Sequence, residues 1–259
     1  MLALELVCAA IVATYAVARR DALPELALLA VAGFVGEDSV IRAYGFYHYS
    51  PRWHLFLDQV PLDIVLIWPI VIHSAWSLAR RLSPRASWIP LVGGAIVLAD
   101  ASMIEPIAVH ARLWTWTEPG LFAVPPIGII GWAYFAGAAM ACLERQRAPL
   151  AVVLAPAATH VMLVASWWAA FKWLSRPLPA WPFVAAAWLV LGGLAVAAWR
   201  LRRRRRGAGA DREMRTDLLL RGPGAAFFFV LLILYGRDLP ALCLYSAAFA
   251  PPYLALLLG

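Results

Sequence analysis

Long apolar stretches follow one another along almost the whole of this 259-residue chain. Each runs for roughly 15–25 residues, and a helix of about 20 residues spans the hydrocarbon core of a bilayer. Only 14% of the residues are charged, and 63% are apolar, which is far more apolar surface than a water-soluble fold of this size can bury. The sequence therefore predicts an all-α, polytopic transmembrane helical bundle with about eight spans.

The expected spans are separated by short polar or arginine-rich segments. Seven precede the basic run at 200–206, and they cover residues 2–18, 23–41, 59–79, 86–108, 121–143, 149–173 and 180–199. The first contains Glu5 and lacks a basic start, so we expect a retained helix and not a cleaved signal peptide. Residues 1–200 would form the membrane core and 201–216 a basic linker. Residues 217–259 would form a hairpin of two short helices, or one span with a re-entrant piece.

Basic residues are shared unequally between the loops. If the N-terminus lies outside and every stretch crosses the membrane, sixteen of the 22 Lys and Arg residues fall on the cytoplasmic side. Because basic loops stay in the cytoplasm, the pattern predicts a multi-pass protein of the bacterial inner membrane with its N-terminus outside. The basic run beside the seventh span would anchor it next to anionic lipid. No aromatic or fold signature accompanies that run, so we expect no nucleic-acid partner.

Acidic and aromatic residues gather on the opposite, non-cytoplasmic side of the expected bundle. Glu37 lies near the end of the second span, Asp63 near the start of the third, and Asp100 and Glu105 lie in the fourth. Any one of these carboxylates near a span end could simply reach water, and Trp and Tyr also form interfacial belts. Four carboxylates on one side of adjacent spans nevertheless favour a functional site, because ionisable groups at membrane depth are costly.

The motifs of metal, redox and nucleotide chemistry do not accompany these residues. The five histidines form no HxxxH box, and the sequence contains no HExxH, CxxC, P-loop or GxSxG motif. The three cysteines occur singly in apolar stretches, which is typical of packing residues. The sequence therefore predicts acid–base chemistry by carboxylates, without a metal or a cofactor.

Acidic groups in a greasy, aromatic cavity suit one kind of reaction in particular. A carboxyl group surrounded by hydrocarbon stays protonated near neutral pH, and it can protonate an isolated alkene. Aromatic faces stabilise the resulting tertiary cation by about 0.5–2 kcal/mol each. A second carboxylate or a histidine could then direct water onto the cation. The expected substrate is a lipophilic isoprenoid or polyene that enters from the membrane lipids.

Two blocks of the sequence resemble a known family. Residues 37–68 include the segments YGFYHY and VPLD, and residues 100–132 include DASMIEP, LWTW, GLFAVP and GW. These blocks are similar to the CruF-type carotenoid biosynthesis membrane proteins of bacteria and archaea. Those proteins are carotenoid 1′-hydratases that act on γ-carotene in bacteria and on bisanhydrobacterioruberin in haloarchaea. The resemblance implies cofactor-free hydration of the terminal double bond of a ψ-ended carotenoid.

The resemblance also implies roles for individual residues. The expected catalytic acids are Glu37, Asp63, Asp100 and Glu105. The expected substrate-binding residues are Tyr47, Tyr49, Trp68, Trp114, Trp116 and Trp132. The resemblance does not predict the oligomeric state.

Two positions differ from the family pattern. Glu105 stands where Asp is usual, and no Asn shortly precedes the pair Gly131-Trp132. A related isoprenoid cyclase or isomerase therefore stays open. A transporter of lipids or small molecules is a further alternative, because several prolines would suit broken helices. No internal repeat supports that alternative.

Overall fold

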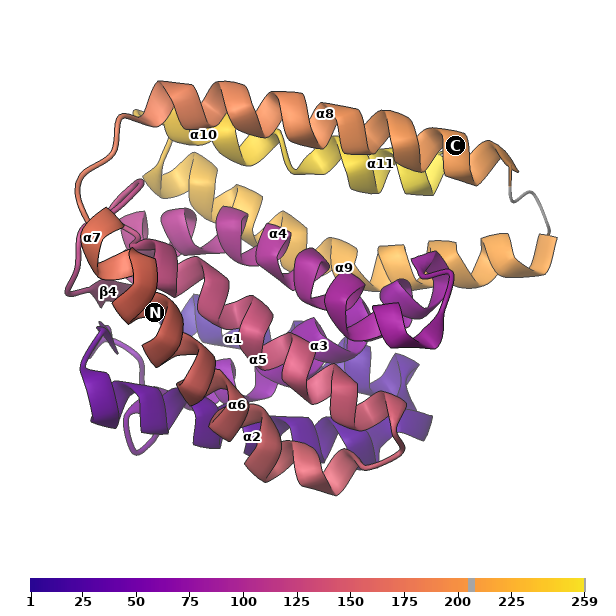
Figure 1. Ribbon diagram of the computed structural model, residues 1–259, viewed down its shortest axis with the longest axis horizontal. Coiled ribbons are helices and arrows are strands. Elements are labelled where there is room, and N and C mark those ends of the chain that lie inside the picture. Colours follow the sequence, from indigo (N-terminus) through magenta and orange to yellow (C-terminus); the bar gives the residue numbers. More distant parts are fainter. Residues whose placement is uncertain (205–207, 259) are drawn as a thin grey trace.

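The computed structural model is a bundle of long helices that run side by side between two ends (Figure 1). The structure describes residues 1–204 and 208–258. Seven of the described helices are long and apolar enough to cross a membrane, and the bent pair α1–α2 raises the number to eight. The prediction of an all-α, polytopic bundle with about eight spans is confirmed.

The helices follow the expected spans closely. In the first half of the chain they are α1 (Leu2–Ala18), α2 (Leu23–Tyr44), α3 (Leu62–Leu82), α4 (Ile89–His110) and α5 (Pro126–Glu144). The second half contains α6 (Ala151–Ser166), α7 (Lys172–Leu174), α8 (Ala180–Arg204), α9 (Ala208–Tyr235), α10 (Pro240–Ala247) and α11 (Ala250–Leu258). A π-helical turn (Trp167–Phe171) joins α6 to α7, and α1 and α2 meet at an angle of 93°.

One end of the bundle, which we call the sheet end, carries two short strands. β1 (Tyr47–Tyr49) follows α2, and β4 (Trp114–Trp116) follows α4. The two strands pair with each other in antiparallel register, so the loops after α2 and α4 lie together. A short hairpin leads into α3, and its two strands, β2 (Phe56–Leu57) and β3 (Val60–Pro61), have two residues each. Near this end His54 bonds to Glu5 of α1 at 2.6 Å.

The opposite end, which we call the arginine end, joins segments that are far apart in the sequence. Arg19, after α1, and Arg81, at the end of α3, both form ion pairs with Asp217 of α9. Arg80 lies 3.7 Å from Glu144, which ends α5. The structure therefore groups the loops into two ends as the alternating spans require. Which end faces the cytoplasm stays a prediction.

The C-terminal part is more helical than the sequence suggested. α8 continues to Arg204 and α9 begins at Ala208, so helix occupies most of the stretch expected as a linker. Residues 205–207 of that stretch lie outside the described residues. In the C-terminal part, α9 provides one candidate span and 240–258 provides a second, which is broken between α10 and α11. The two alternatives for 217–259 stay predictions. α8 and α11 lie side by side along one edge of the bundle (Figure 1).

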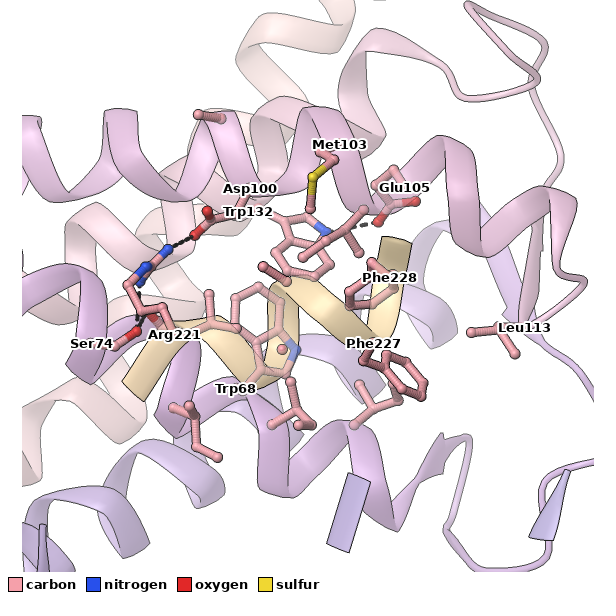
Figure 2. Close-up of a pocket in the computed structure, with 18 of the residues that line it drawn as sticks. Trp68, Ser74, Asp100, Met103, Glu105, Leu113, Trp132, Arg221, Phe227 and Phe228 are labelled. Atoms are coloured by element: carbon pink, nitrogen blue, oxygen red, sulfur yellow. Dashed lines mark hydrogen bonds and ion pairs between the residues drawn. The ribbon is translucent and has the colours of Figure 1, made fainter. Parts of the chain in front are cut away.

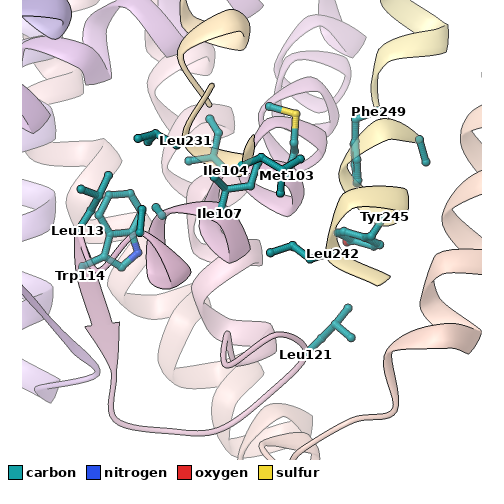
Figure 3. Packing of buried hydrophobic residues seen from close by; sticks show 14 of the residues in the cluster. Met103, Ile104, Ile107, Leu113, Trp114, Leu121, Leu231, Leu242, Tyr245 and Phe249 are labelled. Atoms are coloured by element: carbon teal, nitrogen blue, oxygen red, sulfur yellow. The ribbon is translucent and has the colours of Figure 1, made fainter. Parts of the chain in front are cut away.

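Close packing in the interior holds the helices in register. One cluster of buried residues joins α4 to α9, α10 and the loop after α4, with Ile107, Leu231 and Leu242 almost completely buried (Figure 3). A second joins α2, α3, α4 and α5 around Ile72 and Met140. Helices in a bilayer associate mainly through such van der Waals contacts, because lipid is as apolar as the side chains. This packing fixes the walls of the cavity described next.

Candidate active site

A cavity of about 440 Å³ lies inside the bundle. Side chains from α3, α4, α5 and α9 line it (Figure 2). Further lining residues come from α11 and from both β1 and β4. Most of the lining is apolar or aromatic, but three carboxyl groups and one guanidinium group reach it: Glu37, Asp100, Glu105 and Arg221. Two of these carboxylates, Glu37 and Glu105, belong to the sheet end.

The two strands hold the aromatic residues of the site. Alternate residues of a strand point to opposite faces. The inner face of the β1–β4 pair therefore carries Tyr47, Tyr49, Trp114 and Trp116. On the outer face, Thr115 and His48 bond to each other at 2.8 Å. The register places each tyrosine opposite a tryptophan, and the four rings form a continuous wall.

Glu105 is enclosed by indole groups. Its side chain is buried, with 2% of the residue exposed. The Nε1–H groups of Trp114 and Trp116 donate to Oε2 at 2.8 and 2.9 Å, and Trp132 Nε1–H donates to Oε1 at 2.8 Å. An indole nitrogen donates but does not accept hydrogen bonds. No member of this cage can therefore accept a proton from Glu105, which leaves that proton to a molecule in the cavity.

Glu37 has a cage of the same shape but of different chemistry. The hydroxyls of Tyr47 and Tyr49 donate to Oε2, the latter at 3.0 Å, and Trp68 Nε1–H donates to Oε1 at 2.8 Å. Burial and the adjacent Glu37 carboxyl raise the pKa of Tyr47 well above its usual value, so its hydroxyl stays protonated. Because hydroxyls both donate and accept, this cage suits either protonation state of Glu37.

Contacts between aromatic rings connect the two cages. Trp68, which donates to Glu37, and Trp132, which donates to Glu105, have ring centroids 4.7 Å apart. Tyr47 and Trp116 have the same separation of 4.7 Å. In both cages Oε2 accepts two hydrogen bonds and Oε1 accepts one. The site is therefore a pair of carboxyl groups in one cavity, whose aromatic donors contact each other.

Glycines provide the room for these large rings. A Cβ atom at Gly128 of α5 would lie 2.6 Å from the ring of Trp116, and one at Gly33 of α2 would lie 2.9 Å from Cβ of Trp68. Both separations are too short for real Cβ contacts. The absence of a side chain at these two positions lets the tryptophans reach their carboxylates.

Asp100 lies in the same cavity but in a separate group. It forms an ion pair with Arg221 of α9 (Figure 2). It also accepts a hydrogen bond from the Tyr253 hydroxyl at 2.9 Å. Arg221 also donates to Ser74 Oγ at 2.6 Å. Arg221 and Tyr253 were not predictable as site residues, because both lie in the C-terminal part, where no sequence motif indicates a site.

The structure thus sorts the residues that the sequence singled out. It brings Glu37 and Glu105 together with all six predicted aromatic residues. It places Asp63 in the first turn of α3, half-buried, and within the described part of the chain Asp63 is not among the residues that line the cavity. The catalytic and substrate-binding roles of all these residues stay predictions. No group of three His, Cys, Asp or Glu that could hold a metal ion occurs within residues 1–204 and 208–258.

Comparison with known proteins identifies the family of the chain. Residues 1–180 match the sequence model of a family described as carotenoid biosynthesis protein. The chain belongs to this family. The match confirms the resemblance drawn from the two sequence blocks and supports a role in carotenoid biosynthesis. No curated protein and no solved structure matches the chain.

The family match covers the part of the chain that builds both cages. Every donor to Glu37 and Glu105 lies within residues 1–180, as do α1 to α6. Arg221 and Tyr253 lie beyond it. A multi-pass membrane protein of carotenoid biosynthesis meets isoprenoids and membrane lipids, and an apolar cavity suits such molecules. Family membership also favours an enzyme over the transporter considered from the sequence.

Proposed function

We propose that this protein adds water to the terminal double bond of a ψ-ended carotenoid, with Glu105 as the proton donor and Glu37 as the base. The cage of three indole N–H groups around Glu105 is the observation that carries the proposal. A group surrounded only by donors can give its proton to an alkene but to none of its neighbours. The family description supports the pathway, and the pair of cages supports this particular reaction.

Proton transfer from Glu105 is the first step. The π electrons of the terminal double bond form a new C–H bond to the CH carbon, and a tertiary cation remains at the carbon that bears two methyl groups. Glu105 becomes a carboxylate, whose three hydrogen bonds are then charge-assisted and contribute about 1.5–3 kcal/mol each. Because they strengthen as charge develops, they lower the energy of the transition state more than that of the ground state.

Aromatic rings from both cages stabilise the cation until water arrives. Tyr47, Trp68, Trp116 and Trp132 line the cavity beside the two carboxyl groups. Attraction between a cation and an aromatic face contributes about 0.5–2 kcal/mol for each ring. The same rings therefore serve twice: their N–H and O–H groups hold the acids, and their π faces stabilise the charge.

Glu37 completes the addition by accepting a proton. The oxygen of a water molecule bonds to the cation, and one of its protons passes to the Glu37 carboxylate, which leaves a tertiary alcohol. The proton then returns from Glu37 to Glu105, through water in the cavity, before the next turnover. The sum of the steps is one alkene plus one water, so the reaction is redox-neutral.

Expression in a host that makes lycopene or γ-carotene tests the proposed reaction. We expect a new carotenoid whose mass exceeds that of the precursor by one water. If no ψ-ended carotenoid gains a water in the presence of the folded protein, the proposal is wrong.

Cyclisation or isomerisation of the same end group is the second candidate. The family pattern usually has an Asn shortly before Gly131, and this chain has Ile129 and Ile130 there, so a group that could position water is missing. The first step, protonation by Glu105, would be the same. A product of unchanged mass but altered absorption spectrum would favour this candidate over hydration.

A further inference from the structure

We infer that Ser74, Asp100, Arg221 and Tyr253 form a water-binding subsite of the cavity, and that water reaches this subsite from the arginine end. The inference rests on the proposed hydration, which consumes one water molecule in every turnover. Water is scarce in the hydrocarbon core of a bilayer, so a hydratase in the membrane needs a polar route for its second substrate. The four residues are called the water subsite below.

The water subsite has more hydrogen-bond donors than the protein uses. A guanidinium group carries five N–H donors. Among the described residues, Arg221 donates to Ser74 at 2.6 Å, to Asp100, and to Tyr253 at 3.5 Å. At least two donors therefore remain for an oxygen atom that the protein does not supply. All four residues line the cavity, where such an oxygen can bind.

Water fits these donors better than the organic substrate does. The terminal isoprenoid unit of a ψ-ended carotenoid is a hydrocarbon and offers no acceptor. An ion pair in an otherwise apolar cavity is costly unless its remaining hydrogen bonds are satisfied. Buried waters typically bind where two or more polar groups converge, as they do here between Asp100 and Arg221.

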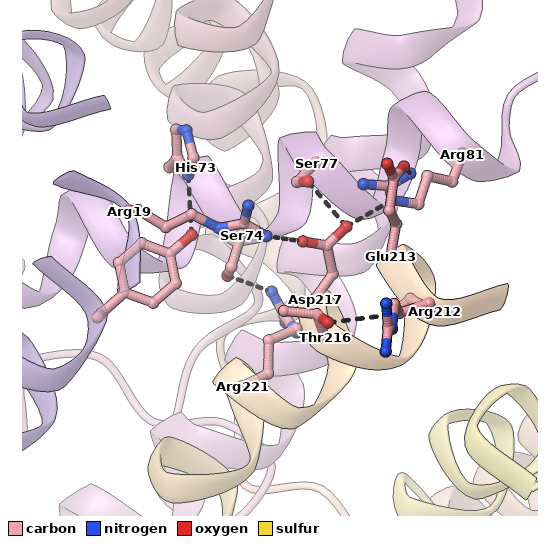
Figure 4. Close-up of polar contacts among 11 residues, drawn as sticks. Arg19, His73, Ser74, Ser77, Arg81, Arg212, Glu213, Thr216, Asp217 and Arg221 are labelled. Atoms are coloured by element: carbon pink, nitrogen blue, oxygen red, sulfur yellow. Dashed lines mark hydrogen bonds and ion pairs between the residues drawn. The ribbon is translucent and has the colours of Figure 1, made fainter. Parts of the chain in front are cut away.

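A ladder of polar contacts connects the water subsite to the arginine end. Ser74 and Ser77 lie three residues apart on α3, and Asp217 and Arg221 lie four apart on α9, so each pair shares one face of its helix. Ser77 donates to Asp217 at 2.9 Å, and one turn further along Arg221 donates to Ser74 (Figure 4). Asp217 in turn binds the basic residues of the arginine end. Polar groups thus continue from that end to the cavity.

The subsite lies close to the reacting groups. Asp100 and Glu105 are five residues apart on α4, which corresponds to a rise of about 7.5 Å along the helix. Both line the same cavity. A water molecule released from the subsite therefore has only a short distance to travel to the part of the cavity that Glu105 lines. Prompt capture by water would favour the alcohol over an alkene isomer, which forms when the cation loses a proton instead.

Cysteine labelling tests the route without depending on activity. Ser74→Cys and Ser77→Cys are made separately in the full chain after Cys8, Cys142 and Cys243 are replaced by Ala. A small, charged methanethiosulfonate is added to membrane vesicles of each orientation. We expect both thiols to react when the reagent reaches the arginine end. Ala139→Cys in the apolar core of α5, where Ala139 is 0% exposed, is the unreactive control. Thiols at 74 and 77 that are as unreactive as the one at 139 would overturn the inference.

Product analysis tests the subsite itself. Ser74→Leu replaces a polar wall by an apolar one, and we expect the ratio of hydrated to isomerised product to fall by about tenfold, the effect of losing one hydrogen bond to a charged group. Ser166→Leu is the matched control, because among the described residues the Ser166 hydroxyl bonds only within its own helix, to Met162 O at 2.6 Å and to Leu163 O at 3.3 Å. Tyr253→Phe provides a second variant if Ser74→Leu does not accumulate.

The outcomes separate this inference from the proposed function. If the natural protein forms no hydrated product, the proposed function fails, whatever the labelling shows. If the natural protein hydrates its substrate and the Ser74 and Tyr253 variants keep its product ratio, the water subsite is wrong and the hydration stands.

Discussion

At the scale of single residues, the number and kind of hydrogen-bond donors set Glu105 apart from the other acidic residues. Glu144 accepts one indole N–H, from Trp76 at 2.6 Å, and Glu118 accepts one from Trp167 at 2.9 Å. Glu105 accepts three. A buried carboxylate with several charge-assisted donors is stabilised far more than one with a single donor.

Trp132→Phe removes one N–H donor from Glu105 but keeps an aromatic face beside the cavity. We expect the rate of hydration to fall by at least about tenfold, because a hydrogen bond to a charged group contributes about 1.5–3 kcal/mol. Trp76→Phe removes the equivalent donor from Glu144 at the arginine end and should leave the rate unchanged. Equal rates in the two variants, measured by product formation in isolated membranes, would contradict the role of the cage.

Glu37→Gln separates the two chemical steps. The variant can no longer accept the proton of the attacking water, but Glu105 can still protonate the alkene. We expect hydration to fall by about 10²–10⁴-fold, the usual contribution of a general base, while isomerised carotenoid of unchanged mass accumulates. Chromatography with mass detection distinguishes the products. Full hydration by this variant would exclude Glu37 as the base.

At the scale of elements, the β1–β4 pairing joins two short segments into one aromatic wall of the cavity. The alternation of Tyr-His-Tyr and Trp-Thr-Trp is present in the sequence and was the one available signal for two paired strands. Their partnership was not predictable, because His48 and Thr115 are 67 residues apart and no local rule joins them. The aromatic residues could therefore be predicted from the sequence, but not the carboxylate to which each one donates.

Gly128→Ala tests the fit between this wall and α5. The new Cβ would lie 2.6 Å from the Trp116 ring and would displace it from Glu105. We expect a marked loss of activity and a lower thermal unfolding temperature. Gly192→Ala in α8 is the matched control, because a Cβ there meets nothing within 4 Å. In detergent, Gly192→Ala should unfold at the same temperature as the natural protein. An unchanged activity and unfolding temperature of Gly128→Ala would contradict the packing.

At the scale of the whole molecule, the spans and the two ends were the most predictable features. The length of each apolar stretch and the placement of arginine in the loops can be read from local sequence. The first indicates whether a helix can cross a bilayer, and the second indicates which loops stay in the cytoplasm. The Asp100–Arg221 ion pair was not predictable, because it joins residues 121 apart on α4 and α9. Only the packing of α9 against the core reveals that Asp100 has a different environment from Glu105.

The same arginine asymmetry predicts the orientation in the membrane. We expect a reporter that is active outside the membrane to function when it is fused to the N-terminus or inserted after Arg52 at the sheet end. A reporter that is active only in the cytoplasm should function when it is inserted after Gln146 at the arginine end. The opposite pattern would reverse the orientation and place the sheet end in the cytoplasm.

Proton donation by Glu105 is tested most directly by running the reaction in D₂O with the natural protein and with Glu105→Gln and Glu144→Gln. Our account predicts that the natural protein and Glu144→Gln form an alcohol with deuterium on the carbon next to the one that bears the hydroxyl. Glu105→Gln should form neither this alcohol nor any isomerised carotenoid, although it folds normally. Deuterated alcohol from Glu105→Gln at the natural rate would contradict the account.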